Sequence, residues 1–266
     1  MSTASDVPEG FEERLQQREA TIRNPLEMRP IKLSSKPDGR IPNTPAAVAT
    51  VAAILGGVFS LGLLLFLSGG FSTYWWTTWQ LGFFISAWSF FHWAEFTITA
   101  GWNLEKCCVD SFLLENGAMY HVAHISALAE YLLTLYFKPS IKSHSYISII
   151  GIVLAISGQA LRSAAMIHAS TSFSHTVAFR KLNTHTLVTD GVYAYFRHPS
   201  YAGFFYWALG TQMVLQNPAN FILFTIILWK FFSSRIKPEE RGLVKFFGQE
   251  YEEYRRRVGT KIPFIP

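Results

Sequence analysis

Residues that could do chemistry gather where a polar segment of the sequence meets an apolar run. Tyr195 to Tyr201 read YFRHPSY, so an arginine and a histidine stand directly before a proline. The residue before a proline is disfavoured in a helix, whereas proline itself is well accepted in a first helical turn. We therefore expect Pro199 to begin a helix and His198 to point away from it, into a pocket at the boundary of the apolar run. A simple cap of that helix is the alternative role for His198, and Arg197 is expected to face lipid phosphate.

Four ionisable residues lie inside long apolar stretches, where a charge is costly and marks a functional candidate by default. His92 and Glu95 are three positions apart, so they share one face of a helix. Glu130 and Arg162 lie in two later stretches. The simpler explanation for Glu95 and Glu130 is that they pair within a helix bundle. Arg162 is a stronger candidate for the site, because it lies near the end of its stretch and beside the polar segment.

The composition indicates a membrane protein. Of the 266 residues, 50% are hydrophobic and 15% are charged, whereas a soluble domain has about 25% charged residues. Apolar stretches lie at residues 46–67, 74–98, 118–137, 146–167, 201–216 and 219–234. No strand is predicted, and the glycine-rich dinucleotide fingerprint that follows a strand is missing. We expect an all-α, polytopic membrane bundle of about six transmembrane helices.

The distribution of lysine and arginine predicts the orientation of these spans. The loop at 168–200 and the C-terminal tail are rich in both residues, whereas the opposite side receives Lys138 and Lys142. Positive charge marks the cytosolic side of a membrane. We expect both termini and the loop at 168–200 to be cytosolic. Residues 1–45 should form a flexible polar tail, and residues 46–266 should form the membrane domain.

The C-terminal tail is predicted to form an amphipathic helix that starts at Pro238. Proline followed by Glu239 and Glu240 is a good helix start, because the ring costs no hydrogen bond there and carboxylates favour the positive end of a helix. A break at Pro238 would then separate this helix from the last span. A plain surface anchor, with basic residues against anionic lipid, is the alternative role. The aromatic residues of the tail should face the membrane or the bundle: Phe246, Phe247, Tyr251 and Tyr254.

Metal and nucleic-acid sites are not expected. Cys107 and Cys108 are adjacent, so they supply neither a disulfide framework nor CxxC metal spacing. The net charge is +5. In a membrane protein, an excess of basic residues indicates the orientation of the spans rather than nucleic-acid binding. The expected partner at this point is membrane lipid.

Several motifs of the chain resemble those of one enzyme family. RHPSYAG and HTLVTDGVYAYFRHPSY, with FFGQEYEEY after the last span, carry the resemblance in the C-terminal half. FHWAEF, DSFLLENG and GQALRSAAM extend it upstream, so that it covers residues 80–266. These motifs resemble the isoprenylcysteine carboxyl methyltransferases. The resemblance implies methyl transfer from S-adenosylmethionine to the C-terminal carboxylate of a prenylated cysteine, in processed CaaX proteins of the small GTPase type. It also implies a multi-pass location in the endoplasmic reticulum membrane.

The resemblance further implies roles for particular residues. Arg235 would hold the substrate carboxylate, because a planar guanidinium binds a carboxylate through two hydrogen bonds and stays charged. Arg162 is a second candidate for a catalytic role. The carboxylate has an ordinary pKa of about 3.5, so it is already ionised and needs no general base.

The cofactor pocket implied by the resemblance is cytosolic. It would lie between the loop before the fifth span and the C-terminal interfacial helix, within residues 159–266. The positions that match cofactor-binding residues of the family are His185, Thr186, Leu187, Val188, Tyr193, His198 and Glu239.

Two other functions explain parts of the pattern. An NADPH-dependent sterol reductase would account for RHPSY and for membrane embedding, but the chain has too few spans and its other motifs resemble the methyltransferases. A non-catalytic protein that binds prenyl groups would leave Arg235 and Glu239 as surface ion-pair residues. Binding of S-adenosylmethionine or of its demethylated product would separate the enzyme from such a binder.

Overall fold

A computed structural model describes residues 39–175 and 186–265 of the chain. Within these residues the structure is helical and contains no strand, which confirms the all-α prediction. Most of the predicted polar tail, residues 1–38, and His185 lie outside the described residues. The main helices are α2 (Pro45–Leu67), α3 (Trp79–Trp102), α4 (Ala118–Phe137), α5 (Ser145–Ala169), α6 (Pro199–Val214), α7 (Pro218–Phe247) and α8 (Gln249–Arg257).

The ends of these helices follow local sequence signals. Pro45, Pro199 and Pro218 each lie in the first turn of a helix, where the missing N–H costs no hydrogen bond. The second predicted stretch started at residue 74, but α3 starts at Trp79. The reason is local, because the side-chain oxygen of Thr78 accepts a hydrogen bond from the first turn of α3 and caps it there.

Three helices of the described residues are long and apolar enough to cross a membrane. They are α2, α5 together with the short turn that follows it, and α7. Large apolar side chains are exposed on the outer faces of the bundle, as lipid contact requires; examples are Leu61, Val122, Val153 and Ile226. The prediction of six spans stays a prediction.

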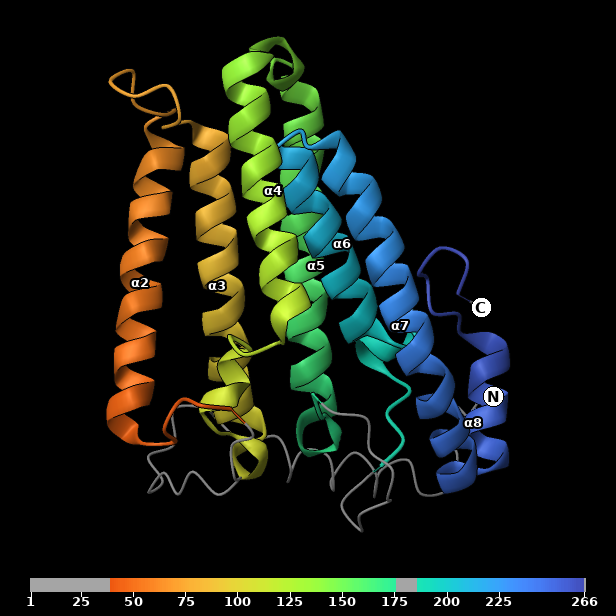
Figure 1. Cartoon of the computed structure of the whole chain (residues 1–266). Coiled ribbons are helices and arrows are strands. Elements are labelled where there is room, and N and C mark those ends of the chain that lie inside the picture. The colour runs from red at the N-terminus through yellow and green to blue at the C-terminus, as the bar shows by residue number, and fades with distance from the viewer. Residues whose placement is uncertain (1–38, 176–185, 266) are drawn as a thin grey trace, which may run out of the picture.

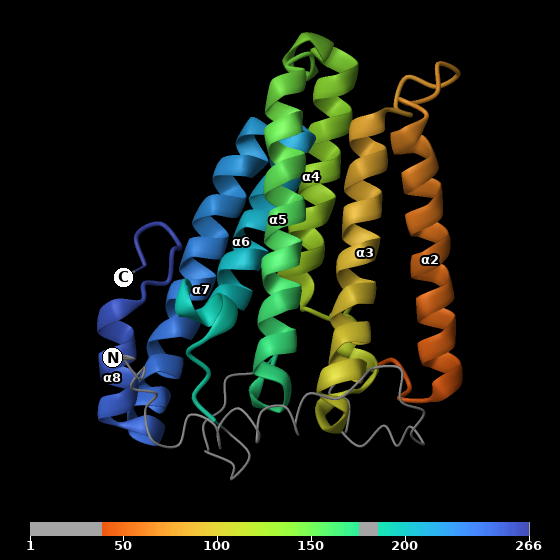
Figure 2. The same cartoon turned by 180° about the vertical axis from the view of Figure 1, so that it is seen from behind.

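The long helices alternate in direction, as Figures 1 and 2 show from opposite sides. The start of α2, the connection from α3 to α4, the segment that leads into α6, and helix α8 all lie at one end of the bundle (Figure 1). The turns between α4 and α5 and between α6 and α7 lie toward the other end. The segment containing His198 and the C-terminal tail therefore share one end of the molecule, as a common pocket requires.

Helices α5 and α6 approach each other closely at glycines. A Cβ atom on Gly158 would lie 2.5 Å from the backbone nitrogen of Trp207, and one on Gly203 would lie 2.6 Å from the carbonyl oxygen of Gly158. Neither position has room for a side chain. This contact holds Arg162, one turn along α5, against the start of α6, where its Nη1 donates to Ser200 Oγ at 2.9 Å.

Helix α7 continues through Pro238, so the predicted break at this residue is wrong. A proline inside a helix removes one backbone hydrogen bond and crowds the preceding turn. The two residues directly after Pro238 offset this cost: Glu239 Oε2 accepts from the Tyr201 hydroxyl at 2.6 Å, and Glu240 Oε1 accepts from Arg197 Nε at 2.6 Å. Both contacts join α7 to α6 and its entry segment. Because the helix is continuous, Arg235 and Glu239 lie on the same face, one turn apart.

Candidate active site

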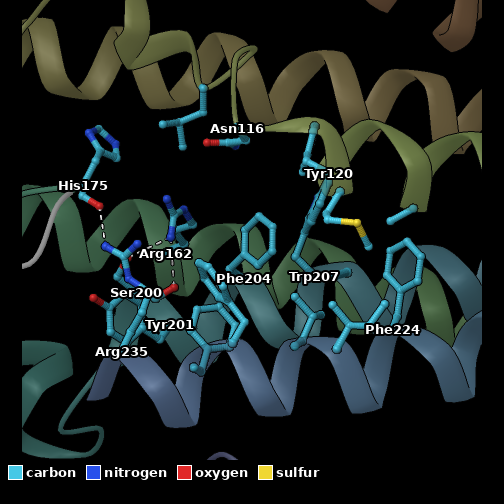
Figure 3. A pocket seen from close by; sticks show the side chains of 18 of the residues that line it. Asn116, Tyr120, Arg162, His175, Ser200, Tyr201, Phe204, Trp207, Phe224 and Arg235 are labelled. Atoms are coloured by element: carbon cyan, nitrogen blue, oxygen red, sulfur yellow. Dashed lines mark hydrogen bonds between the residues drawn. The ribbon is translucent and has the colours of Figure 1, made fainter. Parts of the chain in front are cut away.

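Among the described residues, two neighbouring pockets meet toward the end of the bundle that carries the polar loops, and the larger extends from there along α7 to Phe224. The larger, of about 240 Å³, is lined by residues of α4, α6 and α7, by Arg162 of α5 and by the segments 113–116 and 173–175, and it is mostly apolar. Figure 3 shows Arg235, Arg162 and His175 at one end of it, and Tyr120 and Phe224 toward the other. We call this the apolar pocket.

The second cavity, of about 140 Å³, is lined by the entry segment of α6 and by residues of α7 and α8. We call it the polar pocket. All the cofactor candidates that the structure describes line it: Thr186, Leu187, Val188, Tyr193, His198 and Glu239. Their contact with a cofactor stays a prediction.

The two pockets share one wall. Phe173, Ser174, Ser200 and Tyr201 line both of them. The Tyr201 hydroxyl donates to Glu239 in the polar pocket. The Tyr201 ring lies 5.9 Å, centroid to Cζ, from the guanidinium of Arg235 in the apolar pocket. A ligand in one pocket can therefore meet a ligand in the other at Tyr201.

Arg235 has hydrogen-bonding capacity that the protein does not use. Its Nη2 donates to the backbone oxygen of His175 at 2.7 Å. Its buried Nε has no hydrogen-bond partner among residues 39–175 and 186–265. The guanidinium also lies 5.4 Å from the centroid of the Phe231 ring, within cation–π range. An unsatisfied cation at the meeting point of two pockets is suited to hold an anion.

Arg162 lines the same pocket, but its charge is already paired. Its Nε donates to Glu95 Oε1, and its Nη2 donates to Glu95 Oε2 at 2.8 Å. Both side chains are buried. This confirms the expectation that Glu95 pairs within the bundle. Because its guanidinium is paired with Glu95 and also donates to Ser200, Arg162 is better placed to position Ser200 than to bind a substrate anion.

His175 connects the two arginines. Its Nε2 lies 3.0 Å from Glu95 Oε2, and its backbone oxygen accepts from Arg235. Lys106 fixes the segment before it, because its Nζ donates to the backbone oxygens of Thr171 and Phe173 at 2.8 and 2.7 Å. The sequence interpretation did not single out His175, although it lies in the polar loop.

His198 occupies the position before α6, but its side chain makes no cap hydrogen bond. Its ring is parallel to that of Tyr201, with centroids 5.5 Å apart. Its Nε2 lies 3.2 Å from Glu240 Oε1, and its Nδ1 lies 4.0 Å from Glu239 Oε1. The simple capping role is therefore wrong, and His198 forms part of the wall of the polar pocket.

Arg197 is 7% exposed, so the expectation that it faces lipid phosphate is wrong. Besides its ion pair with Glu240, its Nη1 donates to the backbone oxygens of Arg255 and Val258 at 3.2 and 2.8 Å. These contacts attach α8 and the residues after it to the entry of α6. Tyr251 is buried against the protein, so α8 is more than a plain surface anchor.

Glu130 acts at the far end of the bundle. Its carboxylate accepts hydrogen bonds from the backbone N–H groups of Ala219 and Asn220 at 2.9 and 2.7 Å. These groups lie in the first turn of α7 and have no partner within a helix. Glu130 therefore caps α7, and it forms no ion pair with any residue in 39–175 or 186–265. Within the described residues, no three His, Cys, Asp or Glu side chains group as a metal site would require.

The fold and its two adjoining pockets place the chain in the class of helical membrane proteins that can bring an apolar chain and a polar ligand together. The curated relatives of the chain narrow this class to one activity. The chain is 43% identical over 218 residues to a protein-S-isoprenylcysteine O-methyltransferase of Homo sapiens, with 82% of this chain and 75% of the relative covered. It is 44% identical over 234 residues to the enzyme of that name from Schizosaccharomyces pombe, with 83% of this chain and 96% of the relative covered.

A family model and a solved structure agree with these relatives. The model of the isoprenylcysteine carboxyl methyltransferase (ICMT) family matches residues 149–245, which include most of α5, all of α6 and most of α7. The solved structure, described as a eukaryotic intramembrane Ras methyltransferase, is 40% identical with a TM-score of 0.78. The match covers 83% of this chain and 77% of that one. The chain belongs to the isoprenylcysteine carboxyl methyltransferase family.

Proposed function

We propose that this protein transfers a methyl group from S-adenosylmethionine to the C-terminal carboxylate of a prenylated cysteine, in processed CaaX proteins of the small GTPase type. One observation carries the proposal: Arg235, with donors to spare, lies where an apolar pocket meets a polar one. The names of the relatives support the reaction class and disfavour the sterol reductase.

The residues of the polar pocket fit S-adenosylmethionine. The carboxylate of Glu239 is 28% exposed and suits an ammonium group, while Leu187 and Val188 offer apolar contact to a base. The buried hydroxyl of Tyr251, which has no partner in the part of the chain that the structure describes, offers a further hydrogen bond. When bound, the cofactor supplies an electrophilic methyl group on a sulfonium centre.

The residues of the apolar pocket fit a prenyl chain that ends in a carboxylate. Burial of an apolar tail contributes about 0.8 kcal/mol for each methylene removed from water. The carboxylate is ionised at neutral pH, so the protein has to hold and orient it and to keep water away. Arg235 can hold it through two hydrogen bonds, while Phe204, Trp207 and Leu228 keep the adjoining space apolar.

The prenyl chain would enter from the lipid, between α4 and α7. Met119 of α4 and Phe231 of α7 both line the apolar pocket, yet they are 66% and 46% exposed on the outer surface. Residues that face a pocket and the outside at once mark its mouth. Together with the expected spans and charge distribution, this supports a multi-pass membrane protein with a cytosolic site and cytosolic termini. The expected location in the endoplasmic reticulum membrane depends on the family resemblance.

The test is incubation of the purified full-length protein with labelled S-adenosylmethionine and farnesylated N-acetylcysteine. We expect base-labile label in the product, as a methyl ester requires. Label that resists base would contradict ester formation. Cofactor binding without methyl transfer to any prenylated cysteine would favour the non-catalytic binder.

A further inference from the structure

Helix α8 covers part of the polar pocket and places one tyrosine in its wall. Tyr251 lines the pocket and is only 1% exposed. Its hydroxyl oxygen has no hydrogen-bond partner within the described residues, 39–175 and 186–265. A buried hydroxyl without a partner destabilises a fold, and such groups in folded proteins call for an explanation.

The neighbouring tyrosine shows what a structural hydroxyl on this helix does. Tyr254 also lines the polar pocket and is 3% exposed. Its hydroxyl donates to the backbone oxygen of Tyr193 at 2.7 Å and so attaches α8 to the entry segment of α6. The two rings lie 6.0 Å apart, centroid to centroid. The two tyrosines in this wall therefore differ in their hydroxyl groups. That of Tyr254 has a hydrogen-bond partner, and that of Tyr251 has none within the described residues.

The surroundings of Tyr251 make its hydroxyl a hydrogen-bond donor. Burial raises the pKa of the phenol, and the carboxylates of Glu240 and Glu239 raise it further, while Arg197 opposes them. The group therefore keeps its proton at neutral pH. Glu240 is itself engaged by Arg197 and His198.

We propose that Tyr251 is a cofactor-binding residue, whose O–H donates to an acceptor atom of the methyl donor in the polar pocket. The proposal rests on the proposed function and deepens it, because it makes α8 part of the cofactor site. Glu239 would bind a positive group of the cofactor, and the Tyr251 hydroxyl would donate a hydrogen bond to one of its acceptor atoms. From the sequence, Tyr251 within the FFGQEYEEY motif is expected to face the membrane or the bundle, and no role toward the cofactor is predicted for it.

The test compares Tyr251→Phe with Tyr254→Phe in the full-length protein. Binding of S-adenosylmethionine and of its demethylated product is measured by calorimetry, and the melting temperature is measured without ligand. We expect Tyr251→Phe to weaken both ligands about three- to tenfold, the value of one hydrogen bond. Its ligand-free melting temperature should stay equal or rise, because an unpaired polar atom is removed. Tyr254→Phe should lower the ligand-free melting temperature.

The outcomes separate this inference from the proposed function. If the unaltered protein binds neither ligand, the proposed function fails and the inference falls with it. If the unaltered protein binds and Tyr251→Phe binds equally well, only the inference is overturned. A ligand-free melting temperature that falls as much in Tyr251→Phe as in Tyr254→Phe would also overturn it, because the hydroxyl would then have a structural partner.

Discussion

The two ends of the helix bundle both contain buried polar groups, but they use them differently. At the end away from the pockets, Lys142 donates to the backbone oxygens of Leu215 and Gln216 and to Asn217 Oδ1, at 2.9, 2.8 and 2.8 Å. The three donors of an ammonium are then all used. At the pocket end, Arg235 makes one hydrogen bond and retains a buried Nε without a partner among the described residues.

This difference distinguishes a structural network from a binding site. A buried polar group lowers stability unless it is paired, so a network that serves only the fold should be complete. The Lys142 network holds the turn between α6 and α7, and Glu130 caps the helix that follows. Within the described residues, Arg235 Nε and the Tyr251 hydroxyl have no hydrogen-bond partner, and this favours ligands as their partners. The comparison can be tested by changes at either end.

The largest effect is expected where a complete ion pair is broken beside the site. Glu95→Gln leaves the charge of Arg162 buried and uncompensated, and this should cost about 3–5 kcal/mol of stability. The measurement is thermal unfolding of the purified protein, with the exposed pair in α8 as control through Glu252→Gln, which should cost nothing measurable. Unchanged unfolding in Glu95→Gln would show that this pair does not hold the bundle.

A slightly smaller effect, on activity alone, is expected at the incomplete arginine. Arg235→Ala should lower kcat/KM for the prenylated substrate about 10²–10³-fold, because one positioned donor group is lost from the reacting anion. The melting temperature should stay close to that of the unaltered protein. Arg235→Lys is the matched control and should fall between the two, since it retains the charge without the planar fork. Equal activity in all three proteins would refute the assignment.

The complete network at the far end should respond in the opposite way. Lys142→Met leaves three acceptors with fewer partners, so it should cost about 1–3 kcal/mol of stability. The kcat and both KM values should be unchanged at a temperature where the variant is folded. A selective loss of activity with normal unfolding would mean that the network acts on the site.

The smallest effect is expected at the wall between the pockets. Tyr201→Phe removes the hydrogen bond to Glu239 and retains the ring beside Arg235. The KM for S-adenosylmethionine should rise about three- to tenfold, and the KM for the prenylated substrate should change less. Tyr206→Phe is the matched control, because Tyr206 lies on α6 like Tyr201 but lines neither pocket. Its hydroxyl donates to the backbone oxygen of Lys261. The reverse pattern of KM changes would assign Tyr201 to the substrate side.

The sequence was sufficient to predict the elements that are marked by apolar length and by proline. Pro199 begins a helix as expected, and the predicted cofactor positions within the described residues line one pocket. Local motifs go far here, because five of these six residues lie in one short segment, 186–198, and the sixth is Glu239 of α7.

Other features depend on contacts between distant segments, which no local pattern reports. Pro238 looked like a helix start, and only the hydrogen bonds that Glu239 and Glu240 form with α6 and its entry segment explain why α7 continues. The ion pair of Arg162 joins residues 67 positions apart in the sequence. Arg197 was misplaced for the same reason, because its partners lie in the C-terminal tail.

The central claim is that Arg235 holds the carboxylate of a prenylated cysteine at the junction of the two pockets. It is tested most directly by measuring the binding of farnesylated N-acetylcysteine and of its uncharged carboxamide to the unaltered protein and to Arg235→Ala. We predict that the unaltered protein prefers the carboxylate at least about tenfold, as a charge-assisted hydrogen-bonded pair allows, and that Arg235→Ala binds both ligands equally. A carboxylate preference that survives in Arg235→Ala would contradict the account.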